Sequence, residues 1–253
     1  MGLTAIELAV VWTAGLLIGT SKAGLKGVNV IVVALLVHVY DAKIQTGILL
    51  PLLIVGDVLA VIYYRRHTKW SYLARFLPAM VIGVIIAGAI GDRLGADAFK
   101  TWLGIIVLIS VAIMLWRELK TVQEFPQGMW FAGGLGVAAG FASMIGNLAG
   151  AFANMFFLAT RLPKNEIIGT SAWLFFIINL IKVPIHIWSW ETINMDSLQS
   201  SLLIVPSLFL GFWLGMRVVG LFSEQFYRYF LFCLLYTSPS PRDQRGSRMP
   251  SSA

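Results

Sequence analysis

Residues 128–160 read GMWFAGGLGVAAGFASMIGNLAGAFANMFFLAT, a run of 33 residues without a charged side chain. Two full membrane-spanning helices would need about 40 residues, because one span takes about 20. Within this run, residues 140–154 (GFASMIGNLAGAFAN) interrupt the apolar pattern with Gly, Ser and Asn. Glycine disfavours a continuous helix. The run therefore predicts two short helices joined by a break.

The rest of the chain is equally apolar. Of its 253 residues, 58% are hydrophobic and 12% are charged, whereas a soluble domain has about 25% charged residues. Most of the surface is therefore expected to face bilayer hydrocarbon. The short alternating segments of a β-barrel are not seen, and helices satisfy every backbone group in lipid. The predicted fold class is an all-α integral membrane protein, with further helices at residues 4–20, 28–39, 44–64, 73–91, 98–116, 166–188, 198–220 and from 225 onward.

Composition also narrows the classes of partner and cofactor. A single cysteine, Cys233, excludes an internal disulfide and a cysteine metal cluster, and the three histidines are widely spaced. We therefore expect no cofactor and no metal. The net charge of +7 comes from basic residues scattered through short loops, as the positive-inside rule requires, so nucleic acid is not an expected partner. The N-terminus lacks the basic region of a cleavable signal peptide.

The end of the chain differs in character. Residues 235–253 (LYTSPSPRDQRGSRMPSSA) are polar, rich in Pro, Ser and Arg, and aperiodic. Such a composition predicts a disordered tail, and we interpret it as non-native read-through that truncates the helix beginning near residue 225.

The sequence predicts an internal repeat, although chance similarity between apolar, glycine-rich helices is the alternative. A shift of 122 residues aligns similar residues at several places, and a shift of 128 aligns others, with the change falling in the loop at residues 188–197. The aligned pairs include Ser21 with Ser143, Gly24 with Gly146, Gly47 with Gly169, Asp57 with Asn179, and Gly83 with Gly211. We predict a first repeat at residues 1–122 and a second at 123–234.

Each half has five segments, so the second half is expected to be inverted in the membrane. The loop after residue 64 carries Arg65, Arg66 and Lys69, which predicts a cytoplasmic position. Its counterpart at residues 189–197 carries Glu191 and Asp196 and no basic residue, which predicts an external position. Inverted repeats are typical of secondary transporters, and broken segments at matching positions indicate their binding sites.

Both chain breaks are candidate sites. The first, residues 19–29, reads GTSKAGLKGVN. A helix that restarts after a break presents free N–H groups and a positive dipole end to an anion. Alternatively, the glycines only allow close helix packing, which suits Gly15, Gly19, Gly136 and Gly140. The candidate substrate-binding residues at the two breaks are Ser21, Gly24, Gly27, Asn29, Ser143, Gly146, Asn147, Gly150 and Asn154.

Three lysines have more than one interpretation each. Lys22 and Lys26 flank the first break, where they either neutralise a bound anion or are ordinary cytoplasmic loop lysines. Lys182 lies within a long apolar run, so it is either a site residue, a member of a buried ion pair, or a side chain that snorkels to the interface. All three are kept as candidate substrate-binding residues.

Four further polar residues lie in the apolar segments. Asp57 either carries a coupling proton, together with its repeat counterpart Asn179, or pairs with a lysine. Thr170 and Ser171 follow a glycine near a helix start. They supply hydroxyl donors to a substrate or, more ordinarily, cap the helix.

With the breaks and the repeat in view, the sequence resembles the TauE/SafE sulfite exporter family over about residues 3–234. The second break is followed by residues 162–166 (LPKNE) and 168–171 (IGTS), similar to the short turn and helix start of that family. The G-x-G-G-G run of the family is absent, since residues 23–27 read AGLKG and 146–150 read GNLAG, and Ala172 replaces a typical Leu. The resemblance implies transport of small sulfur-containing anions, such as sulfite or organosulfonates.

The leading hypothesis is a secondary transporter of small anions that works by alternating access in the inner (cytoplasmic) membrane. Its expected partners are the lipid bilayer, an anionic solute and a second copy of the chain. No nucleotide-binding motif of the Walker type is present. The alternatives are a non-catalytic membrane assembly subunit and an intramembrane hydrolase. The hydrolase would use Ser21 or Ser143 with His38 or His186 as base.

Overall fold

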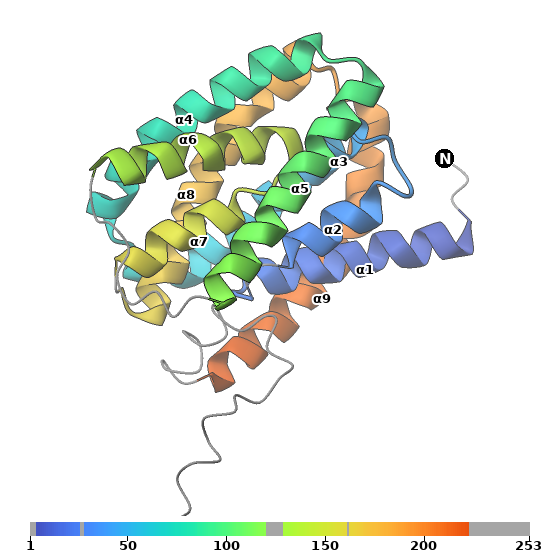
Figure 1. Cartoon of the computed structure of the whole chain (residues 1–253). Helices are drawn as coiled ribbons and strands as arrows, with labels where there is room; N and C mark the ends of the chain where they lie inside the picture. The colour runs from blue at the N-terminus through green and yellow to red at the C-terminus, as the bar shows by residue number, and fades with distance from the viewer. Residues whose placement is uncertain (1–3, 26–27, 120–128, 161, 223–253) are drawn as a thin grey trace, which may run out of the picture.

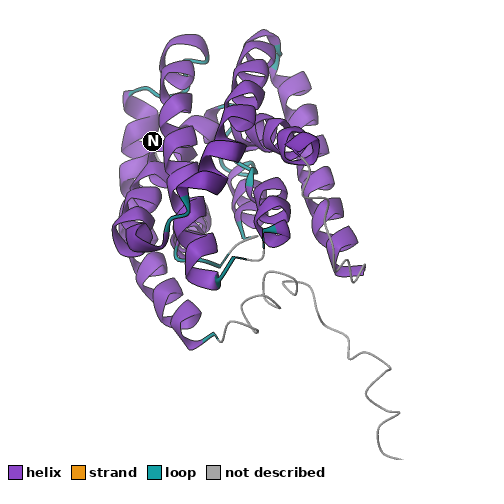
Figure 2. Cartoon of the chain, turned by 90° about the vertical axis from the view of Figure 1, so that its left-hand side faces the viewer, coloured by secondary structure: helices purple, strands orange, loops and turns teal. Residues whose placement is uncertain are grey.

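The computed structural model describes residues 4–25, 28–119, 129–160 and 162–222. Every regular element in these residues is a helix (Figure 2). Six of the helices are long and apolar enough to cross a membrane. The predicted fold class, an all-α multi-pass membrane protein, is therefore confirmed. The helix expected from residue 225 onward and the tail lie outside the described residues.

The helices follow the predicted segments closely. Arg65–His67 forms a 3₁₀ turn, and Ile185–Ser189 forms a π-helical turn. The helices are α1 (Ala5–Lys22), α2 (Asn29–Leu36), α3 (Ile44–Tyr64), α4 (Trp70–Arg93), α5 (Ala96–Leu119), α6 (Met129–Gly146), α7 (Gly150–Ala159), α8 (Lys164–Pro184) and α9 (Met195–Leu221). The two shortest, α2 and α7, each follow one of the predicted breaks.

Local sequence explains several helix ends. Thr4 and Glu7 form a capping box at the start of α1, and Asn194 and Ser197 form another at the start of α9. Pro184 removes a backbone donor near the end of α8, and the chain continues directly as the π-helical turn. Such departures are tolerated at membrane depth where protein packs around them.

The helices divide into a buried centre and an apolar outer layer. Of the six candidate spans, α3 and α8 have the largest buried share. The outer helices expose large apolar side chains, such as Ile85 on α4, Leu108 on α5 and Leu202 on α9. A contiguous apolar exterior is unfavourable in water and is expected of a surface that faces lipid.

Two tight helix pairs flank the centre: α4 packs against α6, and α1 packs against α9, which it crosses obliquely (Figure 1). Glycines make both contacts possible, because a β-carbon at these positions would overlap atoms of the partner helix. This confirms the packing interpretation for four glycines: Gly15 and Gly19, which face α9, and Gly136 and Gly140, which face α4.

The central helices α3 and α8 contact each other reciprocally. Gly47, near the start of α3, packs against the carbonyl of Thr192 in the loop after α8. Gly169, near the start of α8, packs against the carbonyl of Tyr64 at the end of α3. The pairs α1–α9 and α4–α6 show the same reciprocity. In the proposed repeat, α1 corresponds to α6 and α4 corresponds to α9, so each pair joins one helix of each half. A two-fold relation between the halves produces such reciprocal contacts, and the inverted repeat stays a prediction that they support.

Candidate functional site

The position of two polar residues in the central helix pair sets the depth of the site. Asp57 lies ten residues after Gly47, and Asn179 lies ten residues after Gly169. At 1.5 Å per residue, each distance is about 15 Å along its helix. The two glycines mark opposite ends of the α3–α8 pair. Asp57 and Asn179 therefore lie near the middle of a hydrocarbon core about 30 Å thick.

Asp57 joins α3 to two other helices. Its Oδ1 atom accepts a hydrogen bond from Lys22 Nζ on α1 at 2.5 Å, and its Oδ2 atom accepts one from Asn179 Nδ2 on α8 at 2.7 Å. The Asp57 side chain is fully buried and the Lys22 side chain is 8% exposed. Of the two interpretations of Asp57 from the sequence, the structure shows the ion pair with a lysine.

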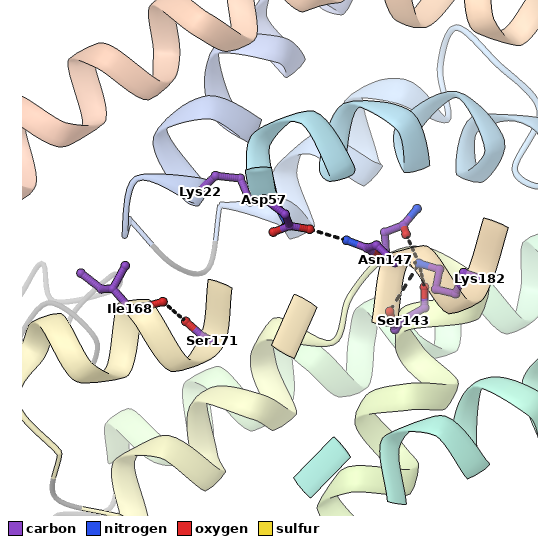
Figure 3. A network of polar contacts seen from close by, with 8 residues as sticks. Lys22, Asp57, Ser143, Asn147, Ile168, Ser171 and Lys182 are labelled. Atoms are coloured by element: carbon purple, nitrogen blue, oxygen red, sulfur yellow. Dashed lines mark hydrogen bonds and ion pairs between the residues drawn. The ribbon is translucent and has the colours of Figure 1, made fainter. Parts of the chain in front are cut away.

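Lys182 continues the polar chain from Asn179 into the second break. Its ammonium group donates to the Ser143 carbonyl at 2.9 Å, to Asn147 Oδ1 at 2.5 Å and to Asn179 Oδ1 at 3.3 Å (Figure 3). The side chain is fully buried, so Lys182 does not snorkel to an interface. Among the described residues, no carboxylate oxygen lies within 4.0 Å of its Nζ atom.

The break between α6 and α7 turns at Asn147, whose φ is 57°. Asparagine is one of the few residues besides glycine that adopt this left-handed conformation readily. The turn places Asn147 Oδ1 at Lys182. The first break turns similarly at Gly24, whose φ is 128°.

A cavity of about 60 Å³ lies where the two breaks meet. One water molecule needs about 10–15 Å³ of such space, so the cavity has room for a small ion. Its wall has an apolar part and a polar part. The apolar residues are Val30, Ala60, Leu148, Ala151, Ile168, Ala172 and Phe175; the polar and glycine residues are Ser21, Lys22, Gly24, Asn29, Asp57, Gly150, Asn154 and Ser171.

The cavity lies to one side of the Asp57–Asn179 pair. Ala60 and Ala172 line it. Ala60 lies between Asp57 and Tyr64 on α3, and Ala172 lies between Gly169 and Asn179 on α8, so both lie between that pair and the contact of Tyr64 with Gly169. This is the end of the bundle that carries Arg65, which the charge pattern predicts to be cytoplasmic.

Two asparagines in the cavity wall have unused hydrogen-bonding capacity. Asn29 Oδ1 and Asn154 Oδ1 are buried and have no hydrogen-bond partner in the described part of the chain. Asn29 is the first residue of α2, and Asn154, which is 8% exposed, lies in the first half of α7. A carboxamide presents either its oxygen or its NH₂ group to a ligand. These two side chains are therefore available to bind a polar ligand in the cavity.

The N-termini of α2 and α7 both open at the cavity. Asn29 and Gly150 are their first residues, and both line it. A β-carbon at Gly150 would meet no atom within 4 Å. Free N–H groups and the positive end of the helix dipole favour an anion at this place.

The structure divides the candidate residues into groups. Ser143, Asn147, Asn179 and Lys182 form the polar chain behind the cavity. Two others lie away from it: Gly146 packs against Leu103, and Thr170 Oγ1 accepts a hydrogen bond from the Lys69 backbone at 2.9 Å. Lys26 and Gly27 are outside the described residues. The candidates that do line the cavity are Ser21, Lys22, Gly24, Asn29, Asp57, Gly150, Asn154 and Ser171.

Sequence reasoning missed the apolar wall. Ala60 follows Asp57 by three residues and Phe175 follows Ser171 by four, so each lies on the same helix face as a polar cavity residue. This helical spacing is the one sequence pattern that connects Ala60 and Phe175 with the cavity. Apolar residues are common throughout this chain, however, so the spacing alone does not single out these two.

The histidines proposed as catalytic bases have other partners. The Nδ1 atom of His186 shares a hydrogen bond with Thr192 Oγ1 at 2.7 Å, and that of His38 with the Ala34 carbonyl at 2.7 Å. Ser143 Oγ lies 3.4 Å from the ammonium group of Lys182. A nucleophilic serine needs a base within hydrogen-bond reach, and the described hydrogen bonds do not pair either histidine with Ser21 or Ser143.

Fold and site together define a multi-pass membrane protein with a small, polar-lined cavity where the two chain breaks meet. The model of the family "Sulfite exporter TauE/SafE" matches residues 11–238. The chain belongs to this family of membrane transporters, and the resemblance seen in its sequence is confirmed. Comparisons with curated proteins and with solved structures gave no match.

Proposed function

We propose that this protein is a secondary transporter of small sulfur-containing anions, of the sulfite or organosulfonate type, in the cytoplasmic membrane. The name of its family, sulfite exporter TauE/SafE, supports this substrate class. The cavity supports it independently, because the N-termini of two helices and an asparagine without a hydrogen-bond partner in the described residues face the same space.

The observation that carries the proposal is the convergence of both chain breaks on one cavity. The N-termini of α2 and α7 supply N–H groups, the ammonium group of Lys22, which is paired with Asp57, supplies further N–H donors, and Asn154 supplies a buried oxygen without a partner in the described part of the chain. Together these groups replace the hydration shell of an oxyanion. The apolar wall formed by Ala172 and Phe175 suits the alkyl group of an organosulfonate.

Alternating access is the proposed mechanism. The polar chain from Lys22 through Asp57 and Asn179 to Lys182 borders the cavity at mid-depth, and we propose that it is the closed side. In the proposed inverted repeat, the two halves exchange conformations, so the cavity closes on one side and opens on the other. Asp57 and Asn179, at the centre of this exchange, are proposed to be the pair that couples the movement to an ion.

Anion flux into liposomes that contain the purified chain tests the proposal. Labelled sulfite and methanesulfonate are the probes, and Asn154→Asp is compared with Asn194→Asp. Asn194 is an exposed N-cap, and Asp caps a helix as well as Asn does, so the same chemical change there leaves the site untouched. In the cavity, two like charges 4 Å apart repel by about 4 kcal/mol at an effective dielectric constant of 20.

We expect saturable flux that falls by about tenfold or more in Asn154→Asp and is unchanged in Asn194→Asp. Well-folded wild-type protein that moves neither anion would contradict the proposed function. The assembly-subunit alternative would then replace it. Equal flux in the two variants would move the anion site away from this cavity.

A further inference from the structure

Three ionisable side chains meet in the membrane core. Lys22 is paired with Asp57. Lys182 is fully buried and, in the described part of the chain, its ammonium group contacts only neutral oxygen atoms. With both lysines protonated and Asp57 ionised, the core holds one positive charge in excess. An uncompensated charge is costly at this depth, so it is expected to have a function.

The surrounding helices do not balance this charge. Among the described residues of α1, α2, α3, α6, α7 and α8, the only other charged side chains are Glu7, Lys164 and Glu166, each in the first turn of its helix. The helices α4 and α9 also pack against this group, and their charged side chains are all exposed: Arg75, Asp92, Arg93, Asp196 and Arg217. Glu166 pairs with Lys69 outside the core, and Lys164 donates to the Phe222 carbonyl.

Asn179 keeps the excess charge in place. Its Nδ2 atom donates to Asp57 at 2.7 Å, and its Oδ1 atom accepts from Lys182 at 3.3 Å. The carboxamide thus stands between the single carboxylate and the second lysine. If Asn179 were an aspartate, it would neutralise the core completely.

From this arrangement we propose that the cavity selects monovalent anions over divalent anions of the same size. The inference rests on the proposed anion transport and names its substrate class more narrowly: an organosulfonate or a singly protonated sulfur oxyanion. One monovalent anion brings the core to neutrality. A divalent anion leaves a negative charge without a partner, which the low dielectric of the core disfavours.

Methanesulfonate and sulfate test this directly, because both are small and tetrahedral and differ by one negative charge. Flux of labelled methanesulfonate is measured in liposomes at zero membrane potential, and unlabelled sulfate is added as competitor. In the wild type, we expect sulfate to inhibit at concentrations about tenfold or more above those of unlabelled methanesulfonate.

A series of variants changes the core charge in steps. Asp57→Asn raises the excess to two positive charges, and Lys182→Met removes it. Asn179→Asp also removes it, with almost no change of shape. The double variant D57N/N179D moves the carboxylate from α3 to α8 and restores a single excess charge, so it is the matched control for both single changes.

We expect Asp57→Asn to shift the preference toward sulfate by about tenfold, and Lys182→Met and Asn179→Asp to lose methanesulfonate flux. The double variant is expected to regain the preference for methanesulfonate. If sulfate competes as well as methanesulfonate in the wild type, or if the ratio stays the same in Asp57→Asn, the inference fails while anion transport stands. If the wild type moves no anion at all, the proposed function fails as well.

Discussion

Replacing Gly140 by alanine tests the packing that holds the second break in position. Gly140 lies on α6 against α4, where an added β-carbon would overlap the carbonyl of Met80 and lie 2.9 Å from the backbone nitrogen of Val84. Both atoms belong to the backbone, so the contact is relieved only if the two helices separate. On the same helix, Gly134 is exposed, and a β-carbon there would meet no atom within 4 Å.

The two substitutions are expected to change stability in opposite directions. Overpacking costs about 1–3 kcal/mol, and contact with rigid backbone places Gly140→Ala near the upper value. The greater helix propensity of alanine returns about 1 kcal/mol, which leaves a net destabilisation of about 2 kcal/mol. Gly134→Ala has no overpacking cost, so the helix propensity of alanine stabilises it by about 1 kcal/mol. For a chain of this size, 1 kcal/mol corresponds to about 2–4 °C in Tm.

Thermal unfolding in mild detergent, followed by the fluorescence of the nine tryptophans, measures the difference. We expect the Tm of Gly140→Ala to fall by about 4–8 °C and that of Gly134→Ala to rise by about 2–4 °C. Shifts of the same sign and size in the two variants would refute the close contact between α4 and α6.

Two further predictions concern the first break and the end of the bundle. Gly24→Ala forces an L-residue into a backbone conformation with φ of 128°, which costs about 1–3 kcal/mol. We therefore expect this variant to have lower thermal stability and lower anion flux. The control is Gly104→Ala, which should show neither change because its added β-carbon would meet no atom within 4 Å. Glu166→Gln removes an ion pair with Lys69 at 3.1 Å in which the lysine side chain is 48% exposed; such a pair contributes less than about 1 kcal/mol, so a change in flux would show that this pair has a role in transport.

The helices could be predicted because charge and polarity mark their ends. The segment predicted at residues 44–64 is found as α3 with the same bounds, since Lys43 precedes it and Arg65 follows it. The segment predicted to begin at residue 198 begins instead at Met195. Its polar first turn is helical because Asn194 caps it, a signal that hydropathy alone does not contain.

The partners of the buried charges could not be predicted. Lys22 and Asp57 are 35 residues apart, as are Asn147 and Lys182, and no periodicity in the sequence encodes a distance between helices. The sequence showed that Asp57 needed a proton or a lysine, because an isolated carboxylate is costly in a membrane. The structure identifies Lys22 as the partner of Asp57, because α1 packs beside α3.

The central claim is that the anion occupies this cavity. Protection of a cysteine at position 171 from chemical labelling tests that claim most directly. The Ser171 side chain lines the cavity and is 3% exposed, and Cys233 is the only cysteine of the chain. In a Cys233→Ser background, Ser171→Cys provides a single thiol in the cavity wall. Arg66→Cys provides a control thiol in the exposed turn after α3.

The rate of maleimide labelling is measured with and without methanesulfonate at about ten times its apparent Kd, where a single site is about 90% occupied. We expect the anion to slow labelling of Ser171→Cys by about fivefold or more and to leave Arg66→Cys unaffected. Equal labelling of Ser171→Cys at anion concentrations that saturate flux would contradict the account, because it would show that the transported anion binds elsewhere.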